Sequence, residues 1–416
     1  MILWLQLLIL VALLAIPFDM IRYHVLGVPF SVSEIATSVA FVLFLASKKR
    51  VLPLDGKVWI FSFLLIFGTV LAIGYQAFWG DIVSPEAVLH RGCGILKAWF
   101  FLPLLFGWLL YQIVGWFPWF RNTVILGIVC MTISVAGVAF FSGFLGGYTY
   151  DGRLVGLWQS PNFLALLLVP MWPFFLLLLC RECTLRKKNV TNIVTTLLGS
   201  AVSLAMLLLT RSYGGIIAAD VSALLFFHFG FPKPFQKYTR FLLALVLVGT
   251  VLFGTILLKN TSLQEYFSLD SRSSFASRVM IWRSSAKMLA DSPIFGIGPG
   301  NFQEVYLVYQ QFFPPYLEWA VPEPHNVFLA FWLNSGLIGL IAFLGLLWLW
   351  FYRLFQALPR GARLESAALL AAMSSILVHG LIDTPYWRTN LAFLFWMIFF
   401  FGLAVSQNPK SEEGVR

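Results

Sequence analysis

Long runs of apolar residues, separated by short polar connections, make up most of the chain. A run of about 18 or more apolar residues can cross roughly 30 Å of hydrocarbon. Such runs must be helical, because a bilayer offers no water to satisfy backbone groups. The pattern predicts an all-α, polytopic integral membrane protein forming a single membrane domain over residues 1–416. Its roughly twelve spans are predicted near 2–17, 30–46, 57–74, 96–115, 122–141, 162–180, 191–210, 213–229, 240–258, 326–352, 364–383 and 389–406.

The longest interruption, residues 260–325, separates the ninth and tenth spans and is predicted to be an outer, periplasmic loop. Residues 273–290 have helical spacing, and a glycine-rich run follows at 296–300. A helix stop and a turn explain this run better than a phosphate cradle does, because no nucleotide-binding pattern surrounds it. The apolar stripe of the predicted loop helix runs through Phe275, Val279, Trp282, Ala286 and Leu289.

Composition and charge agree with this class and suggest an orientation. Hydrophobic residues make up 60% of the chain and charged residues 11%, whereas a soluble domain has about 25% charged residues. Most Lys and Arg residues lie in loops on one side, as cytoplasmic loops do. The net charge of +10 is therefore an orientation signal and no evidence for nucleic acid. The predicted inner residues are Lys48, Lys49, Arg50, Lys57, Arg121, Arg181, Arg186, Lys187, Lys188, Lys233, Lys237, Arg240, Arg353, Arg360, Arg363, Lys410 and Arg416.

Several arginines on the other side are unlike ordinary loop charges. Arg211 lies in a tight outer turn, and Arg153 precedes the helix start at Asn162. Arg278 and Arg283 lie on the predicted loop helix. Arginine near a membrane is costly unless it faces a wet cavity and has a partner. We expect these arginines to form a positive cavity that binds an anion such as a diphosphate, whose oxygens match the planar guanidinium.

The peptide Pro322-Glu-Pro-His-Asn326 places His325 at the mouth of the bundle, beside the arginine loop. A lone histidine is more often structural. Near arginines, however, like charges disfavour the protonated imidazole, and a neutral imidazole is what a general base requires. Together these parts form a plausible glycosyl-transfer site, in which arginines stabilise a leaving diphosphate and His325 takes a proton from the incoming hydroxyl.

Other polar residues have open interpretations. His379 and Asp383 share a face of the eleventh span, where a structural pair is favoured over a proton-linked one. Asp220 in the eighth span fits a transporter carboxylate and a structural residue equally well. Cys180 and Cys183 form a lone Cys-x-x-Cys without metal partners. No His/Asp/Glu cluster has metal-ligand spacing, so neither a metal nor another cofactor is predicted.

Five short segments, in their order and spacing, resemble the O-antigen ligase and polymerase superfamily of bacterial membrane glycosyltransferases. The resemblance covers residues 153–383, and the first third of the chain carries no matching motif. The segments are Arg153–Asn162, Thr210–Gly214, Arg278–Trp282 with Pro293–Gly298, Pro324–Asn326 with Gly336–Gly339, and His379–Asp383.

The resemblance implies metal-independent, inverting transfer of an undecaprenyl-diphosphate-linked glycan to an acceptor hydroxyl, at the outer face of the bacterial cytoplasmic membrane. The acceptor would be a lipid core, as in lipopolysaccharide, or a glycan or protein. One departure is Tyr213, which stands where many relatives have a second basic residue. The implied catalytic residues are His325, Arg211 and Arg278, and the implied substrate-binding residues are Arg153, Arg283, Asn162, Tyr213 and Asn326.

Three alternatives stay open from the sequence. The superfamily also contains Wzy-type polysaccharide polymerases and protein O-oligosaccharyltransferases, which these motifs do not separate from ligases. The alternative outside the glycosyltransferases is a membrane transporter of a small anion or glycolipid. A transporter would place essential charges at mid-membrane, often beside broken helices in repeated halves. The distinctive charges here are predicted at the outer face, which favours the enzyme.

Overall fold

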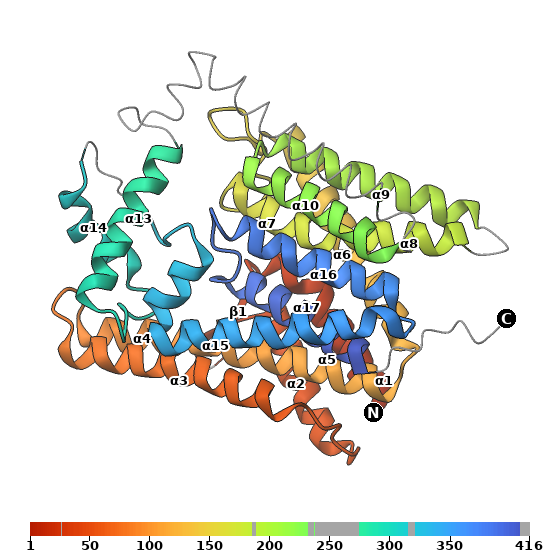
Figure 1. The fold of residues 1–416 in the computed structure, drawn as a ribbon, viewed down its shortest axis with the longest axis horizontal. Helices are drawn as coiled ribbons and strands as arrows, with labels where there is room; N and C mark the ends of the chain where they lie inside the picture. The colour runs from red at the N-terminus through yellow and green to blue at the C-terminus, as the bar shows by residue number, and fades with distance from the viewer. Residues whose placement is uncertain (26, 185–188, 232–236, 238–273, 315–320, 408–416) are drawn as a thin grey trace.

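The computed structural model describes the chain except for residues 26, 185–188, 232–236, 238–273, 315–320 and 408–416 (Figure 1). The described chain is predominantly helical, as predicted, and eight helices are long and apolar enough to cross a membrane. This confirms a polytopic membrane protein. The predicted ninth span, 240–258, lies outside the described residues. The long apolar helices are Gly56–Trp79, Pro85–Trp116, Phe120–Phe144, Pro161–Cys183, Val190–Leu209, Tyr213–Gly230, Val327–Ala357 and Thr389–Gln407.

The first two helices, α1 (Ile2–Ala15) and α2 (Val32–Ala46), are shorter apolar helices. Between them lies a small antiparallel hairpin, β1 (Arg22–Val25) and β2 (Val28–Ser31), which the hydrophobic pattern did not predict. Ser31 ends the hairpin and caps α2 by accepting a hydrogen bond from the backbone N–H of Glu34. The hairpin is too short and too exposed to be read from apolar periodicity.

The bundle packs around α17 (Thr389–Gln407), whose membrane-length window is entirely buried. Helix α5 (Leu102–Trp116) packs against α17, α3 (Gly56–Trp79) against α15 (Val327–Ala357), and α10 (Tyr213–Gly230) against α16 (Arg363–His379). Helix α4 (Pro85–Ile95) continues through a π-helical turn (Leu96–Phe101) into α5. The remaining bundle helices are α6 (Phe120–Phe144), α7 (Pro161–Met171), α8 (Pro173–Thr184) and α9 (Val190–Leu209).

Two further helices, α13 (Ser274–Asp291) and α14 (Phe302–Tyr309), lie at one end of the bundle, which we call the α13 end (Figure 1). The predicted loop helix is confirmed by α13, but its predicted apolar stripe is wrong in register. Ala286 is exposed, whereas Ser284 and Ser285 are completely buried. The helix buries the face that packs against α14 and α15, and that face includes small polar residues which a search for apolar spacing leaves out.

The glycine-rich run packs against a break in α15. Gly336 has φ 66° and ψ −177°, so it interrupts the helix, and the N–H groups of Ile297 and Gly298 both donate to the carbonyl of Leu333 there. A Cβ on Gly336 would lie 2.4 Å from the carbonyl oxygen of Ile294. This confirms the structural interpretation of the run, because two of its backbone N–H groups donate to a carbonyl at the helix break and are not left to bind a phosphate.

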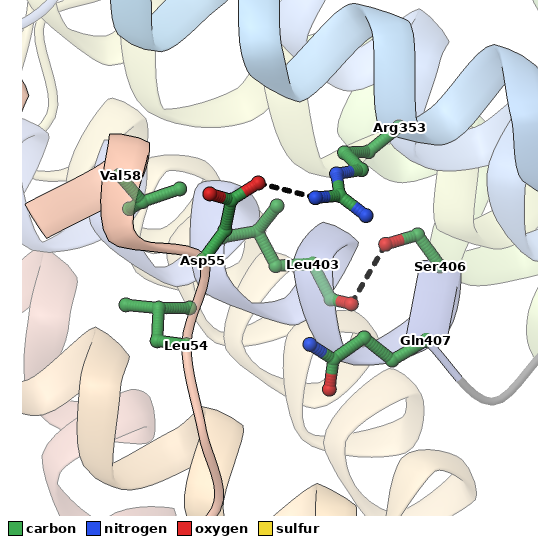
Figure 2. Close-up of a pocket in the computed structure, with 7 residues that line it drawn as sticks. All are labelled: Leu54, Asp55, Val58, Arg353, Leu403, Ser406 and Gln407. Carbon is green, nitrogen blue, oxygen red and sulfur yellow. Dashed lines mark hydrogen bonds and ion pairs between the residues drawn. The ribbon is translucent and has the colours of Figure 1, made fainter.

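The opposite end of the bundle is held by an ion pair (Figure 2). Arg353 near the end of α15 binds Asp55, whose carboxylate also accepts the N–H of Lys57 and so caps α3. Nearby, Arg181 of α8 pairs with Glu365 of α16. Basic residues predicted to be cytoplasmic therefore tie helix ends together at the end away from α13.

Candidate active site

A loop of residues 380–388 joins α16 to α17 and organises the site at the α13 end. It is fastened to the start of α15 by two hydrogen bonds. The N–H of Val327 donates to Gly380 O at 2.7 Å, and the Asn326 side chain donates to Leu381 O at 3.0 Å. The Asn326 carbonyl oxygen also caps α15, by accepting the N–H groups of Phe328 and Leu329. The residue before Asn326 is thereby placed against this loop.

That residue is His325, and its Nδ1 lies 3.2 Å from Oδ1 of Asp383. The same carboxylate oxygen accepts the backbone N–H of Thr384 at 2.9 Å. An ionised carboxylate only accepts hydrogen bonds, so the imidazole proton belongs on Nδ1 and the Nε2 lone pair is left available. The side chain of His325 is 32% exposed and that of Asp383 only 9%, so the imidazole can meet a ligand while its carboxylate partner stays covered.

The backbone of His325 is in an unusual conformation for a residue with a side chain. Its φ is +49°, in the left-handed region, and such conformations persist only where surrounding contacts hold them. Trp282 of α13 supplies two of these contacts, because its indole N–H lies 3.1 Å from Pro324 O and 3.3 Å from His325 O. The imidazole is therefore positioned by both α13 and the 380–388 loop.

The environment of Asp383 keeps the carboxylate charged. Burial alone would raise its pKa, but the hydrogen bond from His325 and the charges of His325, His379 and Arg278 hold the pKa well below its usual range. Asp383 is thus an acceptor at any ordinary pH, which keeps the Nδ1–H tautomer of His325 in place.

Two more arginine-bearing elements meet on the same loop. Arg278 of α13 donates from Nε to the carbonyl of Ile382 at 2.9 Å. Gly214, at the start of α10, lies so close to Ile382 that an added Cβ would be 2.4 Å from its side chain. Ile382 precedes Asp383, so α13, the turn before α10 and the His325–Asp383 pair all converge there.

Arg211 lies in that turn, with an exposed side chain and φ +49°. The turn is supported by Arg153, which donates from Nε to Thr210 O at 2.9 Å and from Nη2 to the Asn162 side chain at 2.8 Å. The predicted grouping of Arg153, Asn162 and the Arg211 turn is therefore present. Arg153 and Asn162 support the turn, whereas Arg211 has an exposed side chain whose Nη1 lies 3.4 Å from Asp151 O.

Three of the predicted site residues are placed less directly. Arg283 is exposed on α13, roughly 140° around the helix from Arg278 at 3.6 residues per turn, so the structure does not bring it to the 380–388 loop. Tyr213 is 59% exposed at the start of α10. The side chain of Asn326 is engaged in capping α15 and in holding the loop, as described above.

The prediction that Asp383 and His379 share a helix face is wrong. Helix α16 ends at His379, four residues earlier than predicted, so the two residues do not share a helix face. Asp383 contacts His325 instead, and the Nδ1 of His379 has no hydrogen-bond partner among the described residues. No sequence signal indicated the His325–Asp383 pair, because 58 positions separate the two residues.

A second carboxyl group near the histidine was also missed. Glu323 lies two residues before His325 and contacts the Asn334 side chain at 3.5 Å. Burial raises the pKa of Glu323 to about 8, although the Asn334 contact and the charge of Arg388 act in the opposite direction. The group is therefore largely neutral at pH 7 and adds little negative charge beside the arginines.

Asp220 is exposed on α10, and the structure gives it no ion pair with another described residue. The four cysteines, Cys93, Cys130, Cys180 and Cys183, are free. Over the described part of the chain, no three His, Cys, Asp or Glu side chains gather as metal ligands would. The chemistry-bearing cluster is thus made of arginines and one His–Asp pair.

Comparison with known families identifies the central part of the chain. Residues 198–344 match the family model described as O-Antigen ligase. The chain carries an O-antigen ligase domain. This domain covers about a third of a polytopic membrane protein. The matched segment includes Arg211, Arg278 and His325, whereas Arg153 and Asp383 lie outside it. No curated protein matches the chain significantly.

Proposed function

We propose that this O-antigen ligase family enzyme transfers a glycan from a polyprenyl diphosphate to an acceptor hydroxyl at the α13 end of the bundle. The observation that carries the proposal is the convergence of His325, paired with Asp383, and Arg278 on one loop. The Arg211 turn packs on the same loop through Gly214. A base and several cations at one place suit a reaction in which a hydroxyl loses a proton while a diphosphate leaves.

The arginines would bind the diphosphate of the donor. Arg278 is held against the 380–388 loop, because its Nε donates to the Ile382 carbonyl. Arg211 is exposed in a turn that Arg153 braces. Guanidinium groups match phosphate oxygens in pairs. Fixed cations help most where charge develops in the transition state, which here is the leaving diphosphate, so no divalent ion is required by the proposal.

The histidine would act as the general base. The acceptor oxygen attacks the anomeric carbon and forms the new glycosidic bond, while its proton passes to Nε2 of His325. The bond between the anomeric carbon and the diphosphate oxygen breaks, and its electron pair leaves with the polyprenyl diphosphate. Attack opposite to the leaving group inverts the anomeric configuration. The Asp383 carboxylate stabilises the imidazolium that forms, as the aspartate of a catalytic triad does.

The proposed sidedness follows from the charge distribution. The predicted cytoplasmic residues include Arg353 and Arg181, which lie at the end away from α13. The site would then face the periplasm, where lipid-linked glycans are exported. A reporter fused after Lys188 should read cytoplasmic and one fused within residues 263–273 should read periplasmic. The reverse pattern would place the site on the wrong side of the membrane.

The acceptor distinguishes three related activities: ligation to a lipid core, polymerisation onto another lipid-linked glycan, and transfer to a protein. All three use the same donor chemistry, so the cluster around His325 supports them equally. A transporter would instead move its cargo without forming a new bond.

The test is a transfer assay with purified protein in nanodiscs, given undecaprenyl-diphosphate-linked oligosaccharide and an acceptor extract in the presence of EDTA. We expect a covalent glycan product and release of undecaprenyl diphosphate in equal amounts. Transfer that strictly requires a divalent ion would contradict the arginine-based mechanism. Movement of the glycolipid across sealed vesicles without any covalent product would favour the transporter.

A further inference from the structure

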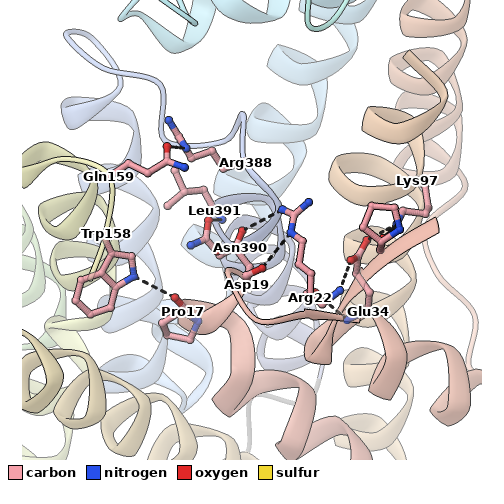
Figure 3. A network of polar contacts seen from close by, with 12 residues as sticks. Pro17, Asp19, Arg22, Glu34, Lys97, Trp158, Gln159, Arg388, Asn390 and Leu391 are labelled. Carbon is pink, nitrogen blue, oxygen red and sulfur yellow. Dashed lines mark hydrogen bonds and ion pairs between the residues drawn. The ribbon is translucent and has the colours of Figure 1, made fainter. Parts of the chain in front are cut away.

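A second polar cavity lies beside the proposed active site. It has a volume of about 380 Å³ and is bounded by the segment after α1, the start of α7 and the start of α17. Figure 3 shows the surrounding polar network, with Arg388 directed toward Gln159 and Arg22 toward Asp19. The volume is at the lower end of the roughly 300–1,000 Å³ of small-molecule sites, which suits one or two sugar units.

The cavity is tied to the active site by the 380–388 loop. This loop carries Ile382 and Asp383 at the arginine and histidine cluster, and it ends at Arg388, which lines the cavity. On the other wall, Gln159 and Phe163 flank Asn162, which binds Arg153. The cavity therefore shares the 380–388 loop with the His325–Asp383 pair and with Arg278, although none of these three residues lines it.

Aromatic rings form the apolar part of the lining. These are Trp99, Trp158 and Phe163. Trp158 is fixed by a hydrogen bond from its indole N–H to Pro17 O at 3.0 Å, and the Arg388 guanidinium lies 4.9 Å from the centre of the Phe163 ring. Rigid rings offer flat apolar faces to the C–H groups of a sugar ring. The same rings would give little binding energy to a hydrated phosphate.

The polar part of the lining alternates donors and acceptors. Asp19 and the Gln159 carbonyl oxygen can accept hydrogen bonds, whereas Arg22 and Arg388 donate. Arg22 lies 3.8 Å from the Asp19 carboxylate, and Arg388 donates a hydrogen bond to the neutral Gln159 side chain, so both cations already have partners in the wall. A carboxylate in the wall disfavours a diphosphate, and the polar groups disfavour a lipid tail. A neutral polyhydroxylated ligand satisfies both sets.

One buried hydroxyl in the wall lacks a partner among the described residues. Thr389 lines the cavity and is only 2% exposed, and its Oγ1 makes no hydrogen bond within that part of the chain. A buried polar group that lacks a partner is costly, so such a group usually marks a site that another molecule completes. Burial also raises the pKa of Asp19, against the charges of Arg22 and Arg388. The Thr389 hydroxyl and the Asp19 carboxyl group are thus suited to hydrogen bonds with a ligand rich in hydroxyl groups.

We propose that this cavity is the saccharide subsite for the acceptor, holding the sugar whose hydroxyl is presented to His325. The inference rests on the proposed function. The diphosphate-binding arginines lie on the side of α10 and α13, while the cavity lies across the 380–388 loop from them. His325 contacts this loop through Asp383, so the proposal places the base between the donor phosphates and the acceptor sugar.

The test uses two variants of the cavity wall and one control. Thr389→Val removes the unpartnered hydroxyl and keeps the shape, and Leu157→Trp fills the cavity from a position that is 58% exposed. Leu145→Trp is the matched control, because Leu145 is 88% exposed and does not line the cavity. The acceptor probe is a membrane lipid extract from a strain lacking the gene, titrated at saturating undecaprenyl-diphosphate-linked oligosaccharide.

We expect the acceptor KM to rise roughly fivefold in Thr389→Val, the value of one hydrogen bond, and roughly tenfold or more in Leu157→Trp. The donor KM and the thermal stability should stay at the wild-type values, because the Thr389 hydroxyl bonds to no other residue that the structure describes. An unchanged acceptor KM in both variants would overturn the subsite. A change in the donor KM instead would assign the cavity to the donor. A wild-type protein that forms no product would refute the proposed function, and the subsite with it.

Discussion

Replacing Asp383 by Asn tests whether its carboxylate prepares His325 for catalysis. Oδ1 of Asp383 accepts hydrogen bonds from both His325 and the Thr384 N–H. The Asn side chain is nearly the same size, and its carbonyl oxygen can keep both contacts. The change therefore removes the charge while preserving the packing. If the amide turns over, its NH2 group faces Nδ1 and imposes the tautomer with the proton on Nε2, which cannot act as a base.

The expected loss follows from these two cases. A hydrogen bond to a charged group contributes about 1.5–3 kcal/mol, against about 0.5–1.5 kcal/mol for a neutral one. Losing the charge should thus cost at least about 1 kcal/mol of imidazolium stabilisation, or roughly fivefold in kcat. The wrong tautomer would bring the loss to as much as about 10⁴-fold. The donor KM should change little, since the arginines provide donor binding.

The assay compares initial rates of glycan transfer by wild-type protein and Asp383→Asn at saturating donor and acceptor, with Thr384→Ser as a nearby control. The pKa of Asp383 is depressed in the folded protein. Its contribution to stability is therefore present above the unfolded pKa of about 3.9 and is lost as pH falls through the folded pKa. The stability difference between the two proteins should stay constant from pH 5 to 8. A kcat within threefold of wild type would refute the positioning role.

Three other predictions follow from named contacts. Arg211→Ala and Arg278→Ala should each abolish transfer and weaken donor binding, whereas the control Lys287→Ala should transfer at the wild-type rate. Lysine at either arginine position should restore little activity, because it lacks the planar guanidinium group. Active alanine variants would contradict diphosphate binding. Because the pKa of Glu323 is raised to about 8, the stability of the wild-type protein should decline as pH rises from about 4 to 8. The melting temperature of Glu323→Gln should lack this decline. The same pH dependence of melting temperature in both proteins would contradict the burial argument. Gly336→Ala should lower the free energy of unfolding by about 1–3 kcal/mol from backbone strain alone, and an unchanged melting temperature would contradict the proposed break in α15.

The membrane class of the fold could be predicted from the sequence, because its apolar runs are long and strongly hydrophobic. Eight long apolar helices and two shorter ones correspond to predicted spans, whereas the predicted eleventh span is the 17-residue α16, which is not among them. Arg211, Arg278 and His325 were recognisable because charged groups and a histidine are rare in such a chain. The match of residues 198–344 to the O-antigen ligase family supports the same assignment.

What the sequence could not provide is the pairing that depends on tertiary packing. The helical pattern extended the eleventh span through Asp383, whereas Gly380 lies outside the helix and the following turns carry Asp383 to His325. Residue spacing cannot reveal a contact between loops 58 positions apart. The cavity beside Arg388 was missed for the same reason, because its wall comes from four separate parts of the chain.

The central claim is that His325 takes the proton from the acceptor hydroxyl, and His325→Ala tests it most directly. Donor binding and transfer would be measured on the same purified preparations, with labelled undecaprenyl-diphosphate-linked oligosaccharide. We predict that the variant binds the donor as tightly as the wild type while its transfer rate falls roughly 10²–10⁴-fold, the usual contribution of a positioned base. A variant that transfers as fast as the wild type would contradict the claim.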